Sequence, residues 1–261
     1  MTEKLTVKEV RDLFGRINSD DDPLFSRFAQ DPRAGVAKVI AQTRRRLRKQ
    51  AAALAAFRGR FRYENELWRQ GIKYVAGMDE VGRGPLAGPV VTCAVILNAD
   101  FDLVGVTDSK QLTPKEREEL YLRIVDEAVE VSLAVNDAPV IDQLNIYAAT
   151  QQAMIRAVGQ LHHQPQHLIV DAVPLDIDIP QNTLIKGDQK SISVAAASIV
   201  AKEYRDHLMK DYDRIYPGYD FADNMGYGTA KHLAGLAKLG ATPIHRRSFS
   251  PVQKAIKKQQ K

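Results

Sequence analysis

Residues 77–89 read Gly-Met-Asp-Glu-Val-Gly-Arg-Gly-Pro-Leu-Ala-Gly-Pro, and they are the most informative stretch of the chain. A segment typical of a β-strand ends in two adjacent carboxylates, Asp79 and Glu80, and a glycine-rich loop follows at once. In a regular strand the two side chains point to opposite faces, so they converge only where the strand ends or distorts. The glycines allow that distortion. Convergent carboxylates suit a hard divalent cation, although an Asp-Glu pair beside glycine is more often only a polar turn.

The elements on either side of this stretch predict an α/β domain. We expect strands over residues 74–78, 90–97, 131–135, 168–171 and 179–186. We expect helices over residues 113–129, 140–161, 191–216 and 229–239, the first of them opened by the capping box Thr113-Pro-Lys-Glu116. Two consecutive strands before the first of these helices indicate a mixed sheet rather than a fully parallel one.

Two further acids follow predicted strands or turns. Asp171 ends the apolar run that begins at His167, and the ends of such strands are where open α/β sheets place their sites. A strand-ending turn residue is an equally good interpretation of Asp171 alone. Asp188 lies in the polar loop 186–190, where an isolated aspartate is more often a turn residue than a ligand.

Together these acids suggest a centre for phosphoryl transfer. Three separated carboxylates and a neighbouring fourth are typical of a site that holds two Mg²⁺ or Mn²⁺ ions about 3.5–4 Å apart. The six histidines include no His-x-x-x-His pair, which disfavours zinc. A serine hydrolase is also disfavoured, because the chain has no Gly-x-Ser-x-Gly elbow.

Composition sets the class of protein. The 261 residues are 44% hydrophobic and 26% charged, which excludes a disordered or collagen-like chain. The single cysteine, Cys93, lies in a predicted buried strand and is expected to be a small core residue. The first ten residues are too charged for a signal peptide, and the longest apolar run, 90–97, is too short to cross a bilayer. We therefore expect a cytoplasmic protein without a membrane segment.

Positive charge is concentrated at one end. Residues 1–70 hold 16 of the 37 basic and 9 of the 32 acidic residues, a net charge of +7, so the remainder has a net charge of −2. This region is predicted to be helical, with a capping box at Thr6-Val-Lys-Glu9, a break at Asp20-Asp-Asp-Pro23, and helices over residues 35–57 and 64–70. Its basic run could grip a nucleic-acid backbone without reading sequence, or it could be only a solvated surface; the residues concerned are Arg44, Arg45, Arg46, Arg48, Lys49, Arg58, Arg60 and Arg62.

Over residues 73–252 the chain closely resembles ribonuclease HII, the bacterial type 2 ribonuclease H. The resemblance rests on several motifs in the same order, which is far more specific than any one of them. They are residues 79–90, Asp108-Ser-Lys110 with Leu112, Val170-Asp171, Lys186-Gly-Asp188, Ala196-Ala-Ser198-Ile-Val-Ala-Lys202 with Arg205-Asp206, Gly226-Tyr227-Gly-Thr229, and His245-Arg-Arg-Ser-Phe249.

The resemblance implies a role for each matching residue. Asp79, Glu80, Asp171 and Asp188 match the catalytic, metal-binding acids, with Asp79 and Asp171 expected to contact both ions. Gly82, Arg83 and Gly84 match a loop that senses the ribose 2′-hydroxyl, the group that separates RNA from DNA locally. Tyr227 matches a tyrosine that packs against the sugar beside the scissile bond. Weaker candidates for phosphate contacts are Ser109, Lys110, Lys202 and Arg205, of which the last two could equally belong to a solvated helix face.

The resemblance also implies the fold and the activity. We expect a ribonuclease H-like mixed sheet flanked by helices, with a basic helical extension over residues 1–70, a catalytic core over residues 71–217 and a helical C-terminal segment over residues 218–261 that completes the substrate cleft. The implied reaction is hydrolysis of the RNA strand of RNA–DNA hybrids, and a cut 5′ of single ribonucleotides in duplex DNA, leaving 3′-hydroxyl and 5′-phosphate ends. Nothing in the sequence indicates an obligate oligomer, so we expect a monomer.

Three alternatives stay open at this point. Ribonuclease HIII is similar but favours Gly-Lys-Gly after the acidic pair and a glutamate as the fourth acid, where this chain has Arg83 and Asp188. A non-catalytic nucleic-acid-binding module is a second alternative, although clustered acids facing phosphates are of no use to it. A structural, metal-stabilised domain is the third.

Overall fold

A computed structural model describes residues 5–259 of the chain, which divides into two compact units, Met1–Arg58 and Gly59–Lys261. The first unit contains α1 (Val7–Gly15), α2 (Pro23–Phe28) and all but the last turn of α3 (Ala34–Arg60). The second contains five strands: β1 (Val75–Val81), β2 (Val90–Ile96), β3 (Glu130–Asn136), β4 (His167–Asp171) and β5 (Gln181–Leu184). Its helices are α4 (Arg62–Arg69), α5 (Pro114–Glu127), α6 (Ala138–Leu144), α7 (Ile146–Gly159), α8 (Ile192–Ile215), α9 (Phe221–Asn224), α10 (Ala230–Leu239) and α11 (Ser250–Gln259), with short 3₁₀ turns η1 (Ser109–Gln111) and η2 (Gly187–Gln189).

The first unit folds around its own apolar cluster. The capping box at Thr6 and Glu9 is present at the start of α1, as predicted. The expected break before Pro23 is also present, but it leads into a short helix, α2, that the sequence analysis did not predict; Asp22 caps it by accepting a hydrogen bond from the Leu24 amide. Buried side chains from α1, α2, α3 and the segment after α1 fill the interior: Val10, Phe14, Ile17, Phe25, Phe28, Val36, Val39 and Leu47.

The second unit is built on one mixed sheet in the order β3-β2-β1-β4-β5. β3, β2 and β1 are antiparallel neighbours, whereas β1, β4 and β5 run parallel. Because β1 and β2 are joined by the glycine-rich loop, they form the antiparallel pair, and helical crossovers supply the parallel strands. The predicted mixed sheet is therefore confirmed.

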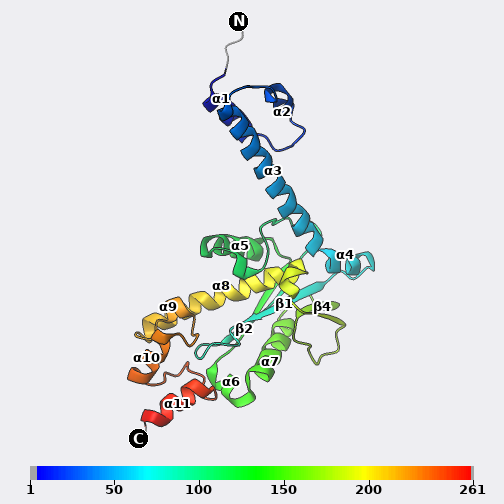
Figure 1. Cartoon of the computed structure of the whole chain (residues 1–261). Coiled ribbons are helices and arrows are strands. Elements are labelled where there is room, and N and C mark those ends of the chain that lie inside the picture. Colours follow the sequence, from blue (N-terminus) through cyan, green and yellow to red (C-terminus); the bar gives the residue numbers. More distant parts are fainter. Residues whose placement is uncertain (1–4, 260–261) are drawn as a thin grey trace. The chain divides into compact units, whose positions relative to one another are not determined.

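Helices cover both faces of this sheet (Figure 1). Alternate residues of β1 face opposite ways: Ala76 and Met78 pack with Ala153 and Met154 of α7, and Val75 packs with Val194 of α8. α8 approaches the sheet closely at Gly77, where a Cβ atom would lie 2.2 Å from the backbone of Ser193. α8 packs mainly on β1 and β2, and its residues Ser198, Lys202 and Arg205 border the same cavity as Asp79 and Glu80 of β1.

One predicted helix is wrong in detail. The apolar pattern over residues 140–161 suggested a single helix, but the chain breaks at Asn145 between α6 and α7. Asn145 has a positive φ of 71°, which an asparagine tolerates better than most residues. Its side chain accepts hydrogen bonds from the amides of Tyr147 and Ala148, and so caps α7.

Residues 59–70 pack with the sheet unit. Glu64 of α4 is only 1% exposed, and its carboxylate accepts hydrogen bonds from the hydroxyls of Ser191 and Ser193 and from the Ser193 amide. Glu64 therefore binds the N-terminal turn of α8 through residues of that turn. The positive end of the helix dipole lies there, and it favours a negatively charged group such as this carboxylate. The boundary between the two compact units falls after Arg58, twelve residues before the domain boundary predicted at residue 70. The predicted division into domains stays a prediction.

Two smaller expectations concern burial. Cys93 is a fully buried core residue of β2, as predicted. Over residues 5–259, no helix combines the length and the apolar character that a bilayer crossing demands. The cytoplasmic location stays a prediction.

Candidate active site

The four acids that the sequence singled out line one cavity of about 320 Å³ in the sheet unit. It lies where β1 runs on past the end of β4, since the pairing of these two strands stops at Met78 and Val170. The predicted residues that it brings together are Asp79, Glu80, Ser109, Lys110, Asp171, Asp188, Lys202, Arg205 and Tyr227. Segments more than 140 residues apart in the sequence thus meet at one end of the sheet.

Asp79 lines this cavity and is only 7% exposed. Burial, and then the nearby charge of Glu80, raise its pKa well above the usual range for an aspartate, against a hydrogen bond from Ser198 that lowers it. The hydroxyls of Ser198 and Ser109 lie 3.1 Å apart, which links Asp79 to the loop after β2. A carboxylate held in so poorly solvated a place is stabilised by a positive charge beside it.

Glu80 is held by the arginine of the glycine-rich loop. Its Oε1 lies 3.1 Å from Nη1 of Arg83, while its Oε2 is buried without any hydrogen-bond partner in the described chain. Burial raises the pKa of Glu80, and the bond to Arg83 opposes that shift. An unpartnered, buried carboxylate oxygen is unfavourable by itself, so this atom is poised to accept a cation or a donor.

The other two acids approach from η2 and the end of β4. Asp171 Oδ1 accepts a hydrogen bond of 2.7 Å from the Gly187 amide, which ties β4 to the turn that carries Asp188. Burial raises the pKa of Asp188, and the charges of Asp108 and Asp171 add to the effect. Asp108, just before η1, accepts a hydrogen bond of 3.4 Å from the side chain of Gln189, so the η1 loop is joined to the η2 turn that carries Asp188.

The donor set fits divalent cations that prefer oxygen ligands. Over residues 5–259, no three His, Cys, Asp or Glu side chains stand close enough together to enclose a metal ion as they are. The acids nevertheless share one cavity, burial and neighbouring carboxylates raise the pKa of Asp79, Glu80 and Asp188, and the Oε2 of Glu80 is left without a partner. Each of these features is relieved by added positive charge, and hard oxygen donors favour Mg²⁺ or Mn²⁺.

The glycine-rich loop is shaped by two buried arginines. Gly82 has φ +93°, and a Cβ atom there would lie 2.3 Å from Nε of Arg205, so both conformation and space require glycine. Arg205 donates to the carbonyls of Ala87, Pro89 and Met225, and burial lowers its pKa to about 10. Arg205 therefore supports the loop, and the expected alternative of a solvated helix face is wrong, because the residue is only 1% exposed. Arg205 also lines the cavity, and its contact with a phosphate stays a prediction.

Arg246 has the corresponding role from the C-terminal segment. It is fully buried, and its guanidinium donates to the carbonyls of Gly82, Arg83 and Gly88. Burial, with the charge of Arg205, lowers its pKa to about 9. The motif that contains Arg246 was quoted from the sequence, but a buried role for it was not predicted, because local pattern treats arginine as a surface residue.

The loop and Tyr227 meet at the mouth of the cavity. A Cβ atom on Gly84 would lie 3.3 Å from Cε1 of Tyr227, so the two residues are in near contact. Tyr227 is 50% exposed, and its ring is open to a ligand. Lys110 is exposed at the rim, whereas Ser109 is buried with its hydroxyl on Ser198, and Lys202 pairs with Asp206 at 2.7 Å.

Comparison with known proteins places this site in a family. The family model for ribonuclease HII matches residues 76–252, and the model for the ribonuclease HII N-terminal domain matches residues 6–68. The chain belongs to the ribonuclease HII family. A ribonuclease HII of Limosilactobacillus reuteri is 72% identical over 253 residues, 97% of this chain and 99% of that one, and one of Listeria monocytogenes is 50% identical over 255 residues, 98% and 97% of the two chains. A crystal structure of the ribonuclease H2 of Pyrococcus horikoshii has a TM-score of 0.64 at 26% identity, covering 72% of this chain and 99% of the other.

Membership decides between the alternatives left open by the sequence. The chain is a ribonuclease H, a hydrolase that acts on the RNA strand of RNA–DNA hybrids. The ribonuclease H-like fold predicted from the motifs is confirmed. The family model and the named relatives are those of ribonuclease HII rather than HIII, and relatives this similar favour the enzyme over a binding module or a structural domain.

Proposed function

We propose that this ribonuclease HII also cuts duplex DNA on the 5′ side of a single embedded ribonucleotide, with two divalent cations and with Asp79, Glu80, Asp171 and Asp188 as its catalytic acids. The observation that carries the proposal is the near contact of Gly84 with the half-exposed Tyr227 at the mouth of the acid-lined cavity. To recognise a single ribonucleotide, the protein must contact both its 2′-hydroxyl and the sugar next to the scissile phosphate, and neighbouring residues such as Gly84 and Tyr227 can do so together.

The acids divide the binding of the cations between them. We expect Asp79 and Asp171 to contact both ions; Glu80, through its unpartnered Oε2, would hold one, and Asp188 would complete the other. When bound, two such ions activate water and stabilise charge on the leaving oxygen. The chain itself orients three of these carboxylates, through Arg83 on Glu80, the Gly187 amide on Asp171, and Ser198 on Asp79.

The remaining residues position the substrate. The ring of Tyr227 would pack against the sugar, and the backbone of residues 82–84, held by Arg246, would contact the 2′-hydroxyl. Water then attacks the phosphorus in line with the 3′ oxygen of the preceding deoxynucleotide, and that P–O bond breaks. The 3′ oxygen leaves and is protonated to the hydroxyl, and the phosphate stays on the 5′ oxygen of the ribonucleotide.

The test uses a labelled DNA duplex with one embedded ribonucleotide. The purified full chain is incubated with this duplex in Mg²⁺, in Mn²⁺ and in chelator, with an all-DNA duplex and an RNA–DNA hybrid alongside. We expect one metal-dependent cut on the 5′ side of the ribonucleotide, with a 3′-hydroxyl end and no cut in all-DNA. Cleavage of the hybrid without any cut at the single ribonucleotide contradicts the proposed specificity.

Matched variants separate recognition of the ribose from catalysis. Tyr227→Ala removes the ring and is expected to lower cleavage at the single ribonucleotide more than cleavage of a long hybrid, while Tyr227→Phe retains most of it. Tyr147→Ala removes a tyrosine of similar exposure, 44%, on α7, which does not line the cavity, and is the control. Equal activity of Tyr227→Ala and the control would remove Tyr227 from the substrate site.

A further inference from the structure

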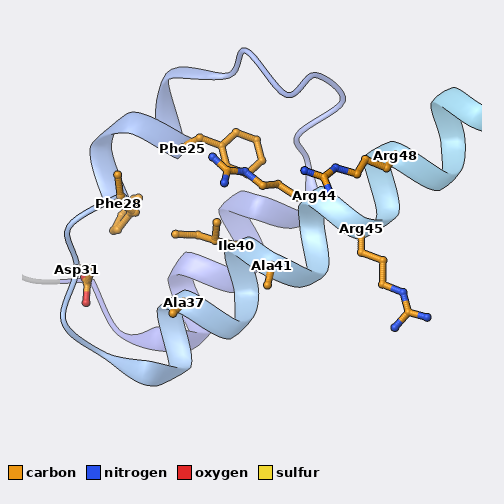
Figure 2. Close-up of a pocket in the computed structure, with 10 residues that line it drawn as sticks. Phe25, Phe28, Asp31, Ala37, Ile40, Ala41, Arg44, Arg45 and Arg48 are labelled. Carbon is orange, nitrogen blue, oxygen red and sulfur yellow. The ribbon is translucent and has the colours of Figure 1, made fainter.

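The first unit contains a second hollow of about 570 Å³, well away in the sequence from every residue of the active site. It lies between α2 and α3, and its apolar floor is formed by Phe25, Phe28, Ala37, Ile40 and Ala41. Figure 2 shows these side chains turned toward one space bordered by the two helices. The volume is within the range of ordinary ligand sites, about 300–1,000 Å³.

One side of the hollow is strongly cationic. Arg44 lies over the ring of Phe25, with its guanidinium carbon 5.1 Å from the ring centroid, and Arg48 extends along the same side (Figure 2). Arg45 also lines the hollow but points away from it in this view. No ion pair joins Arg44, Arg45 or Arg48 to an acid within residues 5–259. The only acid of the lining, Asp31, is bound by Arg33 through both of its oxygens.

The other cations of the basic run are not all available to a ligand. Arg46 donates to the carbonyls of Phe14, in the last turn of α1, and Ile17, just after that helix. Arg60 donates to the carbonyl of Val106 and the hydroxyl of Thr107 in the sheet unit. A continuous basic stripe that follows a nucleic-acid backbone is therefore interrupted. The arginines that remain available at the hollow are Arg44 and Arg48, which adjoin its apolar lining. We call these two residues the arginine edge.

We propose that this hollow docks an acidic segment of a partner protein that inserts an apolar or aromatic side chain. Between residues 34 and 58 the chain has seven basic residues and no acidic one, so its field attracts a negatively charged ligand. A nucleic-acid backbone has the matching charge, but it presents no protruding apolar group and would leave the accessible apolar lining at Ala37, Ile40 and Ala41 uncovered. An acidic peptide with a large apolar side chain satisfies both halves of the site.

This docking role goes beyond the proposed cleavage reaction and does not depend on it. The hollow belongs to a unit with its own core and shares no lining residue with the acid-lined cavity. Its effect would be to bring the nuclease to places where the partner is bound. Binding is therefore measured without substrate, and cleavage is measured separately as a check that the enzyme is intact.

The experiment measures binding of the full chain to a fluorescein-labelled peptide, Glu-Glu-Asp-Phe-Glu-Glu-Leu-Phe, by fluorescence anisotropy. A second peptide has both phenylalanines and the leucine replaced by serine, and a 20-base-pair DNA duplex is the nucleic-acid arm. We expect the first peptide to bind with a Kd below about 100 µM and the serine peptide at least about tenfold more weakly.

Two matched pairs of variants locate the binding. Ala41→Glu fills the hollow with a charged side chain and is compared with Ala52→Glu, the same change at an exposed position of α3 outside the lining. Arg48→Ala is compared with Arg11→Ala, which removes an exposed arginine of α1. We expect Ala41→Glu and Arg48→Ala each to weaken peptide binding about tenfold, and both controls to leave it unchanged. Thermal melting and cleavage of a hybrid verify that each variant is folded.

Three results would overturn the proposal. The first is no binding of the peptide to the wild-type chain. The second is equal binding by Ala41→Glu and Ala52→Glu, which would show that the apolar hollow is not used. The third is an Arg48→Ala variant that loses affinity for the DNA duplex but not for the peptide, which would assign this arginine edge to nucleic acid.

Discussion

The Nε2 atoms of His232 and His245 face each other at 3.0 Å in the interior of the C-terminal segment. The Thr242 amide donates to Nδ1 of His245, so His245 carries its proton on Nε2 and donates it to His232. His232 accepts on Nε2 and donates from Nδ1 to the carbonyl of Tyr227, at 2.9 Å. The two neutral rings thus form a relay that ends on the backbone of the tyrosine proposed to contact the sugar.

This relay predicts a loss of stability in mild acid. Burial, with the neighbouring His232, lowers the pKa of His245 to about 4, below the value near 6.5 of an unfolded histidine. The unfolded chain therefore binds more protons between these values, so stability is present above pH 6.5 and falls as the pH drops toward 4. For His245 alone the expected decrease in the free energy of unfolding from pH 7 to pH 5 is about 2 kcal/mol.

Urea denaturation at pH 7 and pH 5 measures the effect. The His245→Gln variant lacks the titrating group, and its loss of stability between the two pH values should be about 2 kcal/mol smaller than that of the wild type. His207→Gln, which replaces an exposed histidine of α8, should behave as the wild type does. Parallel losses in His245→Gln and the wild type would show that the pair does not titrate in this range.

Arg246 is expected to be essential to the glycine-rich loop. Arg246→Lys keeps the charge but cannot reach the carbonyls of Gly82, Arg83 and Gly88 together, since lysine lacks the planar fork of guanidinium. We expect the free energy of unfolding to fall by about 3 kcal/mol, because a buried charge is left poorly paired. Calorimetry is the measurement, and the exposed neighbour changed in the same way, Arg247→Lys, is the control; equal melting of the two variants would refute the assignment.

Asp79→Asn should separate folding from cleavage. The side chain keeps its shape, and the charge that burial and Glu80 make unfavourable is removed, so the free energy of unfolding in chelator should be unchanged or higher. Cleavage of a hybrid should fall at least about a hundredfold. Asp126→Asn, at an exposed acid of α5, is the control and should cleave normally. A folded Asp79→Asn protein with normal turnover would exclude Asp79 from the catalytic set.

Much of the fold could be read from short-range pattern, and much of the support for the site could not. The capping boxes at Thr6 and Thr113 start helices as predicted, because they depend on residues three apart. Asp171 is the last residue of the apolar strand β4 and lines the cavity, and the sequence predicts this because the apolar run and the acid are adjacent in the chain. Contacts between residues far apart in the sequence leave no local pattern. No residue near Glu64 predicts its hydrogen bonds to the start of α8, and no residue near Arg246 predicts that its side chain is buried.

The break at Asn145 shows a different limit. The apolar period continues through residues 140–161 without interruption, since α6 and α7 both bury one face, and periodicity therefore predicts one helix. The break is stabilised by the side chain of Asn145, which caps α7. This is the effect of a single residue, so it does not alter the apolar periodicity.

Arg60 links the last turn of α3 to the loop that carries the phosphate-contact candidates. Its guanidinium donates to the carbonyl of Val106 at 3.2 Å and to the hydroxyl of Thr107 at 2.9 Å. These residues immediately precede Asp108 and Lys110, and Asp108 is joined in turn to the Asp188 turn through Gln189. Burial lowers the pKa of Arg60, and the charge of Asp188 opposes that shift.

Arg60→Gln is therefore expected to loosen substrate binding more than it slows the chemical step. Release of residues 106–111 displaces Lys110 from the rim of the cavity but leaves Asp79 and Glu80 in place on β1. We expect KM for a hybrid to rise about fivefold to tenfold with kcat reduced less than twofold, a loss of about 1 kcal/mol in binding. Arg58→Gln removes an equal charge from the exposed face of α3, so it controls for long-range electrostatics. The same rise in KM in both variants would attribute the effect to net charge, and a fall in kcat alone would show that Arg60 acts on the acids rather than on the loop.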